Sequence, residues 1–301
     1  MAKKALLVCR AAKCEWCDEL FPDYSHADLP VVGKAFVEYQ LDALSERGCE
    51  KVLVLDYDWC ETLATHLSGG GRRRWPIEME YRKTDRIFVD EGAAKAANAG
   101  FIGTDDVEVV IGLKFPVGDG WREVKSVKEF YDLNFDLLKN PSGYTLNGYS
   151  GEKDVYIGTN VMIKTGRRVV PPLFLGDTSR IEYAVWLMGG VIIGRGSIID
   201  HGTILRHTII FPKTYVGKRM EFSGKIVVGK RVIDPATGSY ADLEEAGLVN
   251  NVDVFTPTGG YSFIEWLIVI ASTVVFLPFY IVFFLLKTIY RGVRSLFAHS
   301  R

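Results

Sequence analysis

Two cysteines, Cys14 and Cys17, are separated by two residues, a spacing at which two thiolates can hold one metal ion. Cys9 and His26 lie nearby in the sequence and are also residue types that zinc binds. No second pair of ligands follows at a suitable spacing. We therefore keep Cys14 and Cys17 as candidate metal ligands, but favour small side chains in a loop and expect no cofactor.

Basic residues gather at two places where phosphate could bind. Arg10 and Lys13 follow the first apolar stretch of the chain, and Arg72 and Arg73 follow three glycines at 69–71. The second group lacks the Lys-Ser/Thr pair of a P-loop, so a solvated turn is its alternative interpretation.

The middle of the chain repeats every six residues. An apolar residue recurs at each sixth position from Ile157 to Phe211, and glycine follows it at 158, 176 and 194. Such a period is typical of a solenoid, in which three six-residue sides would make one turn around a continuous core. The repeat skips one residue near Tyr215.

Over residues 152–235 this pattern resembles the hexapeptide-repeat proteins with a left-handed parallel β-helix. Several proteins of that type are acyltransferases that use a histidine as general base, which makes His201 and His207 candidates. No partner carboxylate stands at a diagnostic spacing, so a surface role for both histidines is the favoured interpretation.

The cysteines, Arg10 and Lys13 all lie within residues 1–145, so the secondary structure of this part determines where they are placed. Apolar strands are predicted at 4–9, 52–55, 77–81 and 107–113, and helices at 36–47, 59–67, 93–100 and 127–139. Alternating strands and helices predict a parallel sheet with helices on its faces.

Residues 29–44, with Leu-Pro-Val-Val-Gly-Lys at their start, resemble the sugar-nucleotide pyrophosphorylases, which are sugar-1-phosphate nucleotidyltransferases. Residues 71–81 resemble the next loop and strand of that family, and 127–134 resemble its closing helix. The resemblance implies a nucleotide-binding domain followed by a β-helix, with Mg²⁺ as cofactor if activity is retained.

Four departures from the family pattern argue against catalysis. The stretch from Cys9 to Cys17 contains no glycine, so close approach of its backbone to a triphosphate is not expected. The family's lysine before the Leu-Pro-Val stretch falls on His26, a shorter side chain that is mostly uncharged at neutral pH and that we keep as a candidate for phosphate binding. The family's metal-binding aspartate has no match at 109–113, and the sugar-binding half is shortened.

The last part of the chain contains a long run without charge, from Trp266 to Leu286. About 20 apolar residues can span a bilayer, so a membrane helix is predicted over 262–287, either spanning or re-entrant at Pro278. It resembles the re-entrant anchor of phosphoglycosyltransferases. Lys287, Arg291 and Arg294 predict a basic amphipathic tail over 288–301 that lies on lipid headgroups.

The composition excludes several classes of protein. Thirty-six basic and 37 acidic residues give a net charge of −1, which argues against nucleic-acid binding. An odd number of cysteines without an export segment predicts reduced thiols in a cytoplasmic globular part attached to the membrane. The predicted fold class is thus a truncated nucleotidyltransferase-like α/β sheet (1–145), a left-handed parallel β-helix (152–235), a linker (236–261) and a membrane helix.

Three functions are compatible with these features. The favoured one is a membrane-tethered, non-catalytic adaptor or sensor in surface-polysaccharide or glycolipid synthesis. The alternatives are an active nucleotidyltransferase or acyltransferase, and a structural oligomerisation scaffold. The expected partners are membrane lipids, an enzyme of polysaccharide or glycolipid synthesis, a sugar nucleotide and further copies of the chain.

Overall fold

The computed structural model describes residues 3–10, 14–57, 60, 75–103, 107–141, 143–164, 168–244 and 247–252, all within one compact unit, Met1–Asp253. The membrane segment predicted at 262–287 and the tail at 288–301 lie outside these residues, as does nearly all of the helix predicted at 59–67.

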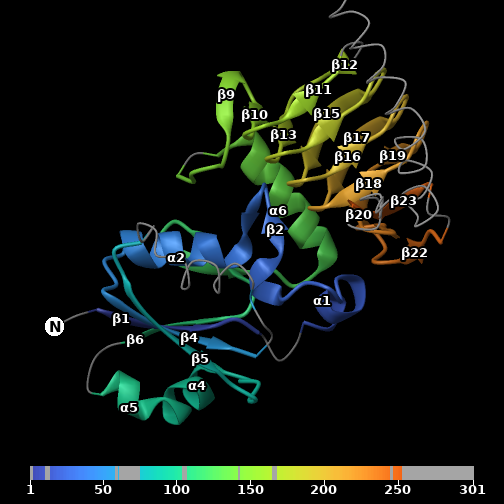
Figure 1. The fold of residues 1–301 in the computed structure, drawn as a ribbon. Coiled ribbons are helices and arrows are strands. Elements are labelled where there is room, and N and C mark those ends of the chain that lie inside the picture. The colour runs from blue at the N-terminus through green and yellow to red at the C-terminus, as the bar shows by residue number, and fades with distance from the viewer. Residues whose placement is uncertain are drawn as a thin grey trace, which may run out of the picture. The chain divides into compact units, whose positions relative to one another are not determined.

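The first part of this unit is built on a four-stranded parallel sheet (Figure 1). Its strands are β1 (Lys4–Val8), β4 (Lys51–Asp56), β5 (Glu78–Lys83) and β6 (Val107–Ile111), in the order β5-β4-β1-β6. Side chains alternate between the two faces of a strand, and here both faces are buried, Leu7 and Val54 in one apolar cluster and Leu6 and Leu53 in another. Burial on both sides explains why β1 and β4 are continuous apolar runs rather than alternating ones.

Helices cover both faces of the sheet (Figure 1). Helix α2 (Phe36–Glu46) packs Val37, Leu41 and Leu44 on one face, and α4 (Glu91–Ala97) and α5 (Ala99–Ile102) cover the other. Between β1 and α2 the chain forms helix α1 (Glu15–Leu20), the 3-10 turn η1 (His26–Asp28), and a hairpin of β2 (Pro30–Val31) and β3 (Lys34–Ala35).

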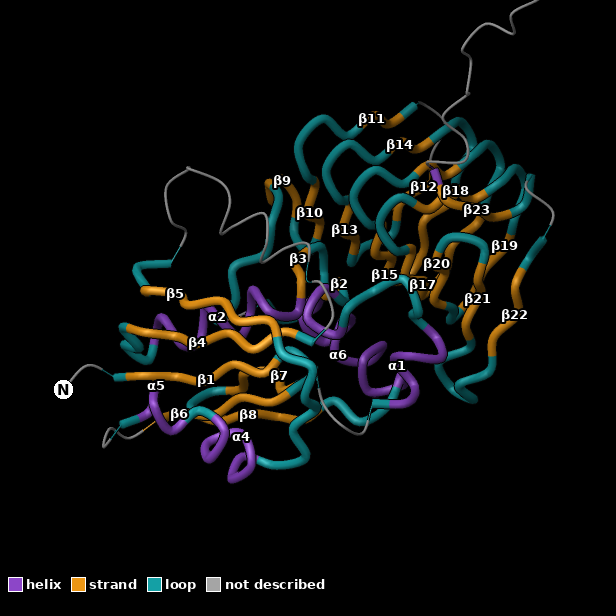
Figure 2. Tube along the Cα trace, turned by 60° about the horizontal axis from the view of Figure 1, so that its bottom comes forward, coloured by secondary structure: helices purple, strands orange, loops and turns teal. Residues whose placement is uncertain are grey.

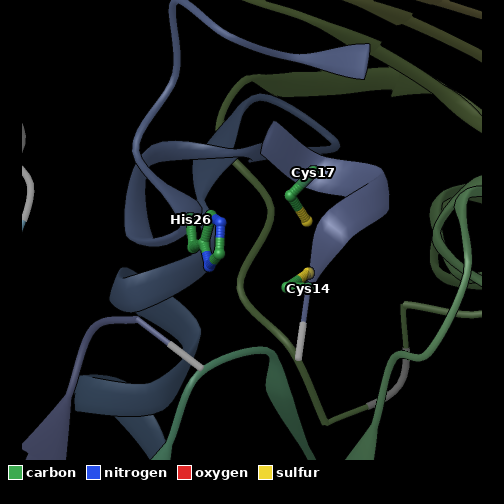
Figure 3. A group of neighbouring side chains, drawn as sticks. All are labelled: Cys14, Cys17 and His26. Atoms are coloured by element: carbon green, nitrogen blue, oxygen red, sulfur yellow. The ribbon is translucent and has the colours of Figure 1, made fainter. Parts of the chain in front are cut away.

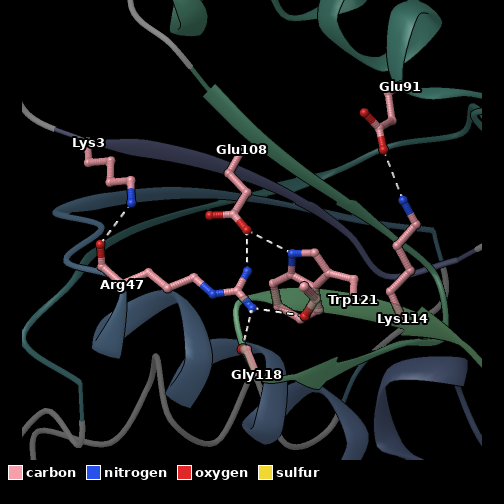
Figure 4. Close-up of polar contacts among 8 residues, drawn as sticks. Lys3, Arg47, Glu91, Glu108, Lys114, Gly118 and Trp121 are labelled. Atoms are coloured by element: carbon pink, nitrogen blue, oxygen red, sulfur yellow. Dashed lines mark hydrogen bonds and ion pairs between the residues drawn. The ribbon is translucent and has the colours of Figure 1, made fainter.

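A polar network fastens a second hairpin, β7 (Lys114–Val117) and β8 (Gly120–Glu123), to the edge of the sheet (Figure 4). Arg47, at the end of α2, forms an ion pair with Glu108 on β6 and donates to the Gly120 carbonyl at 2.9 Å. The Trp121 indole N–H donates to the same Glu108 carboxylate at 2.7 Å. The hairpin is therefore held by the edge strand and by α2 together.

Helix α6 (Val127–Lys139) connects the sheet to the repeat region. It begins at Ser126, whose hydroxyl accepts from the Glu129 N–H at 3.2 Å, while the Glu129 carboxylate accepts from the Lys125 N–H at 3.0 Å. The first bond satisfies an N–H group that the first turn would otherwise leave unpaired, and the second fixes the residue before the cap. The aromatic ring of Phe130 in this helix packs against the ring of Phe21, which directly follows α1.

The repeat region forms a coil of short strands whose successive turns pair in parallel. Val155 lies beside Leu173, and Leu173 beside Val191, so each turn comprises three of the six-residue repeats. Figure 2 shows these turns stacked on one another. One sheet contains β9 (Tyr149–Glu152), β10 (Val155–Ile157), β12 (Arg168–Val169), β13 (Leu173–Leu175), β15 (Trp186–Ile193), β17 (Ile204–Ile210), β19 (Glu221–Ser223), β20 (Ile226–Val228), β21 (Arg231–Ile233) and β22 (Tyr240–Asp242). The other contains β11 (Met162–Ile163), β14 (Arg180–Ile181), β16 (Ile198–Ile199), β18 (Thr214–Val216) and β23 (Val249–Asn251).

The interior register differs from the predicted one at Phe211. Leu187 pairs with Leu205, a full turn of the coil later, but Ile193 pairs with Ile210, which falls one position short of a full turn. The skipped residue therefore lies before Thr208 and not near Tyr215. Ile210 takes the interior place, and Phe211 packs outside the coil core, against Phe21.

The predicted fold class is wrong as a whole. The described residues form mostly strands and few helices, because the repeat region consists of strands of two to eight residues. None of the helices in the described residues is long and apolar enough to cross a membrane. The parallel sheet with helices on its faces is present.

Candidate functional site

The candidate site lies where the strands of the parallel sheet end. After β1 the chain adds β4 and then β5 on one side of that strand, and it afterwards adds β6 on the other side. The direction of strand addition therefore reverses between β1 and β6, which is the switch point of the sheet. Ligands of such sheets bind beyond the carboxyl ends of the strands at this point. Cys9 and Arg10 follow β1 there, and Gly112 follows β6, its carbonyl accepting from the Gln40 amide at 2.8 Å.

One carboxylate engages two basic side chains near the first loop. The Arg10 guanidinium lies 3.0 Å from Asp18 Oδ2, and His26 Nε2 lies 3.2 Å from Asp18 Oδ1. Arg10 also lies over the Tyr57 ring, 5.0 Å from its centroid. His26 is buried at the start of η1, so its ring is fixed there. Both side chains are thus engaged by the one carboxylate of Asp18.

A second carboxylate, Asp56, ends β4 and is fully buried. Its Oδ2 accepts from the Cys60 N–H at 2.9 Å and from the Tyr81 hydroxyl at 2.7 Å. Burial and the neighbouring Asp56 carboxylate raise the pKa of Tyr81, so the phenol keeps its proton and remains a donor. The Cys60 thiol lies 3.2 Å from Asp28 Oδ1. The sequence analysis missed Asp56, although an aspartate directly after the apolar run Val52–Leu55 was the available signal.

The structure brings Cys14, Cys17 and His26 together (Figure 3). Their candidate ligand atoms all lie within 4.8 Å of one another, and all three side chains are buried. Burial raises the pKa of the Cys17 thiol, and its hydrogen bond with Cys14 raises it further. Small side chains in a loop are the favoured prediction for these residues, and metal binding by the two cysteines with His26 nearby is the alternative that this grouping keeps open.

Comparison with known proteins gives a distant similarity. No protein-family model matches the chain. Over 130 residues, which are 42% of this chain, it is 26% identical to a UTP–glucose-1-phosphate uridylyltransferase from Synechocystis sp.. The chain spans about a third of that relative's length. This similarity supports the presence of a nucleotidyltransferase-like domain. The remainder of the predicted resemblance, to hexapeptide-repeat proteins and to a phosphoglycosyltransferase anchor, has no support from these comparisons.

The nucleotidyltransferase-like domain suggests Mg²⁺, which prefers oxygen ligands in octahedral geometry. Among the described residues, no group of three carboxylates gathers at the strand ends to supply such ligands. Asp56 is committed to Tyr81 and Cys60, and Asp28 accepts from Cys60 and from the Ser25 hydroxyl at 3.1 Å. At the end of β6, Val109–Leu113 supply no carboxylate.

The two candidate histidines lie on the coil. Both are exposed, and the Asp200 carboxylate accepts from the backbone N–H of His201, at 2.6 Å, and not from its ring. His207 lies against α6, where its carbonyl accepts from the Tyr131 hydroxyl at 2.5 Å and its ring is 6.2 Å from that of Phe135. Within the described part of the chain, no carboxylate is hydrogen-bonded to either ring to orient it as a general base.

The other predicted site residues lie outside the described part of the chain. These are Lys13, Arg72 and Arg73 of the phosphate-binding candidates, and Trp266, Pro278, Lys287, Arg291 and Arg294 of the predicted anchor. Two cavities are found away from the strand ends. One, of about 520 Å³, lies at the amino ends of β1 and β4, beside Lys4 and Lys51. The other, of about 400 Å³, lies between Trp16, Val127 and Pro235.

Proposed function

We propose that the sheet is a nucleotidyltransferase-like module that binds a sugar nucleotide without catalysing nucleotidyl transfer. In this proposal it acts as an adaptor or sensor in surface-polysaccharide or glycolipid synthesis. The observation that carries the proposal is the position of Asp18 between Arg10 and His26. Nucleotidyl transfer depends on cations that neutralise the triphosphate, and here the Asp18 carboxylate competes with the phosphates for the Arg10 guanidinium and is hydrogen-bonded to His26.

The metal requirement supports the same proposal. Nucleotidyl transfer is assisted by Mg²⁺ bound to carboxylates and phosphates. Asp56, the buried carboxylate at the strand ends, accepts from the Tyr81 hydroxyl and the Cys60 N–H through Oδ2, and residues 109–113 at the end of β6 supply no carboxylate. A nucleotide sugar carries less charge than a triphosphate and depends less on such groups.

We choose a sugar nucleotide as the proposed ligand of this chain because the matched relative is named as an enzyme that uses UTP and glucose 1-phosphate. The proposed partners are an enzyme that uses the bound sugar nucleotide and further copies of this chain.

Calorimetric titration of the purified full chain with nucleotide sugars, beginning with UDP-glucose, tests the binding step. We expect saturable binding of at least one compound, with equal affinity in the presence and absence of Mg²⁺. Asp18→Asn should strengthen triphosphate binding, because it leaves Arg10 and His26 without the competing charge. Asp132→Asn, on the exposed face of α6, is the matched control and should change nothing. Absence of binding by every compound would contradict the proposal.

A further inference from the structure

Three buried side chains lie close together at the start of α1. The proposed function gives none of them a role as a metal ligand. Cys14 directly precedes the helix, Cys17 lies in its first turn, and His26 begins η1. Cys14, Cys17 and His26 are 4%, 1% and 2% exposed, so all three lie beneath the surface. Figure 3 shows the two sulfur atoms and the imidazole ring around one space.

The spacing of these groups suits a tetrahedral metal ion. Zn–S bonds of about 2.3 Å place two sulfur ligands about 3.8 Å apart. All three ligand atoms already lie within 4.8 Å of one another, so a contraction of at most about 1.2 Å closes the site. Cys14 and Cys17 are three positions apart, which places them on one side of a helical turn, where the Cys17 N–H donates to the Cys14 carbonyl at 3.0 Å.

Asp18 holds the histidine in the orientation that metal ligation needs. Its Oδ1 lies 3.2 Å from His26 Nε2. Metal-bound histidines commonly donate their second ring N–H to a carboxylate, which fixes the tautomer and makes the other nitrogen a better ligand. Nδ1 is therefore the nitrogen of His26 assigned to the metal.

Charge and ligand chemistry select the ion. Two thiolates neutralise a divalent cation, and neutral imidazole completes three ligands, so a loaded site adds no net charge to the apolar cluster that contains Cys14 and Cys17. Thiolate and imidazole ligands suit zinc and do not suit Mg²⁺ or Ca²⁺.

We propose that Cys14, Cys17 and His26 bind one Zn²⁺, with solvent or a further ligand in the fourth position. Each thiol releases its proton when the S–Zn bond forms, and the imidazole binds in its neutral form. The ion joins α1 to η1. A helix of six residues is too short to be stable alone, so this bond would fix it in place. The site shares Asp18 and His26 with the group on which the proposed function rests, but zinc binding does not require sugar-nucleotide binding, so either proposal can fail without the other.

Metal titration of the reduced, chelator-treated full chain tests the site. We expect one Zn²⁺ per chain, and Co²⁺ in its place should give a thiolate-to-cobalt charge-transfer band. Cys14→Ser and Cys17→Ser should each weaken that band and lower zinc affinity more than about a hundredfold. Cys49→Ser is the matched control, because Cys49 is buried in a different cluster, and it should bind as the parent does.

Asp18→Asn keeps the proposal testable if the cysteine variants fail to fold, because half of the Asp18 side chain is exposed. It should lower zinc affinity by about ten- to a hundredfold while the cobalt band persists, as expected for a residue that orients a ligand. Failure of the parent chain to bind Zn²⁺ or Co²⁺, or a cobalt band unchanged in both cysteine variants, would overturn the proposal.

Discussion

At the scale of single residues, Asn134 on α6 is buried and both ends of its amide are used. Its Oδ1 accepts from the Val32 N–H at 2.9 Å, and its Nδ2 donates to the Phe130 carbonyl at 2.9 Å. Val32 has a φ of +42°, a conformation that is uncommon for a β-branched residue. The amide thus holds the turn between β2 and β3 in place.

Asn134→Ala should lower the free energy of unfolding by about 2 kcal/mol, because the buried Val32 N–H loses its acceptor. Chemical denaturation of the full chain measures this. Asn140→Ala, at the exposed end of the same helix, is the control and should change stability by less than about 0.5 kcal/mol. Equal midpoints for both variants would show that the amide does not hold the turn.

Part of the site could be predicted from the sequence. Arg10, His26, Cys14 and Cys17 were all candidates from their types and spacing. Their shared dependence on Asp18 could not be predicted, because a stretch of irregular chain separates Asp18 from His26 and no periodicity brings them together. Asp56 was missed because its partner Tyr81 lies on the neighbouring strand β5, distant in the sequence.

At the scale of elements, the interior of the coil depends on apolar side chains from successive turns. Ile193 and Ile199 are fully buried in the coil cluster. Ile193→Asp should lower the free energy of unfolding by about 3 kcal/mol or more, because it buries a charge without a partner. Thermal unfolding measures the loss.

Met162→Asp is the control for that variant, because Met162 is 54% exposed on β11 of the same coil. It should unfold within a few degrees of the parent. If Ile193→Asp did so as well, the assignment of Ile193 to the interior would be wrong.

Glu182, which directly follows β14, forms ion pairs with Lys164 and Arg180. These ion pairs predict that the stability of the fold depends on pH. Hydrogen bonds from Lys164, and then from Arg180, hold the pKa of Glu182 below its usual value of 4.5. A lowered pKa in the folded state stabilises the fold above pH 4.5, and this contribution is lost as the pH falls through the folded pKa. Glu182→Gln removes the titrating group, so its stability should depend less on pH in this range.

Urea unfolding of the parent and of Glu182→Gln at a series of pH values below neutrality measures this difference. We expect the parent to be the more stable protein above pH 4.5 and the two curves to converge below it. Curves that stay parallel throughout would show that the group does not couple folding to protonation.

The elements themselves were predicted to different degrees. Helix α6 begins and ends at the predicted residues, because a serine cap and an apolar stripe are local signals. The skipped residue of the coil was placed near Tyr215, but the register shifts before Thr208. Both placements satisfy the apolar period, and only the pairing with the preceding turn distinguishes them.

At the scale of the whole molecule, contacts between distant parts of the chain were not predicted. Phe21 stacks on Phe211 with centroids 5.0 Å apart, and Arg231 donates to the Glu19 carbonyl at 2.7 Å. These contacts join α1, and the residue after it, to the coil. The partners are separated by more than half of the sequence, so no local sequence pattern predicts that they meet. The helix that contains Cys17 is thereby held against the coil.

The central claim is that the nucleotidyltransferase-like module does not transfer nucleotides. Pyrophosphate release from nucleoside triphosphates and sugar 1-phosphates, measured with the full chain and Mg²⁺, tests it most directly. We predict no release above that of Arg10→Ala, because Asp18 engages the Arg10 guanidinium in the folded protein. Mg²⁺-dependent release by the parent chain that Arg10→Ala abolishes would contradict the account.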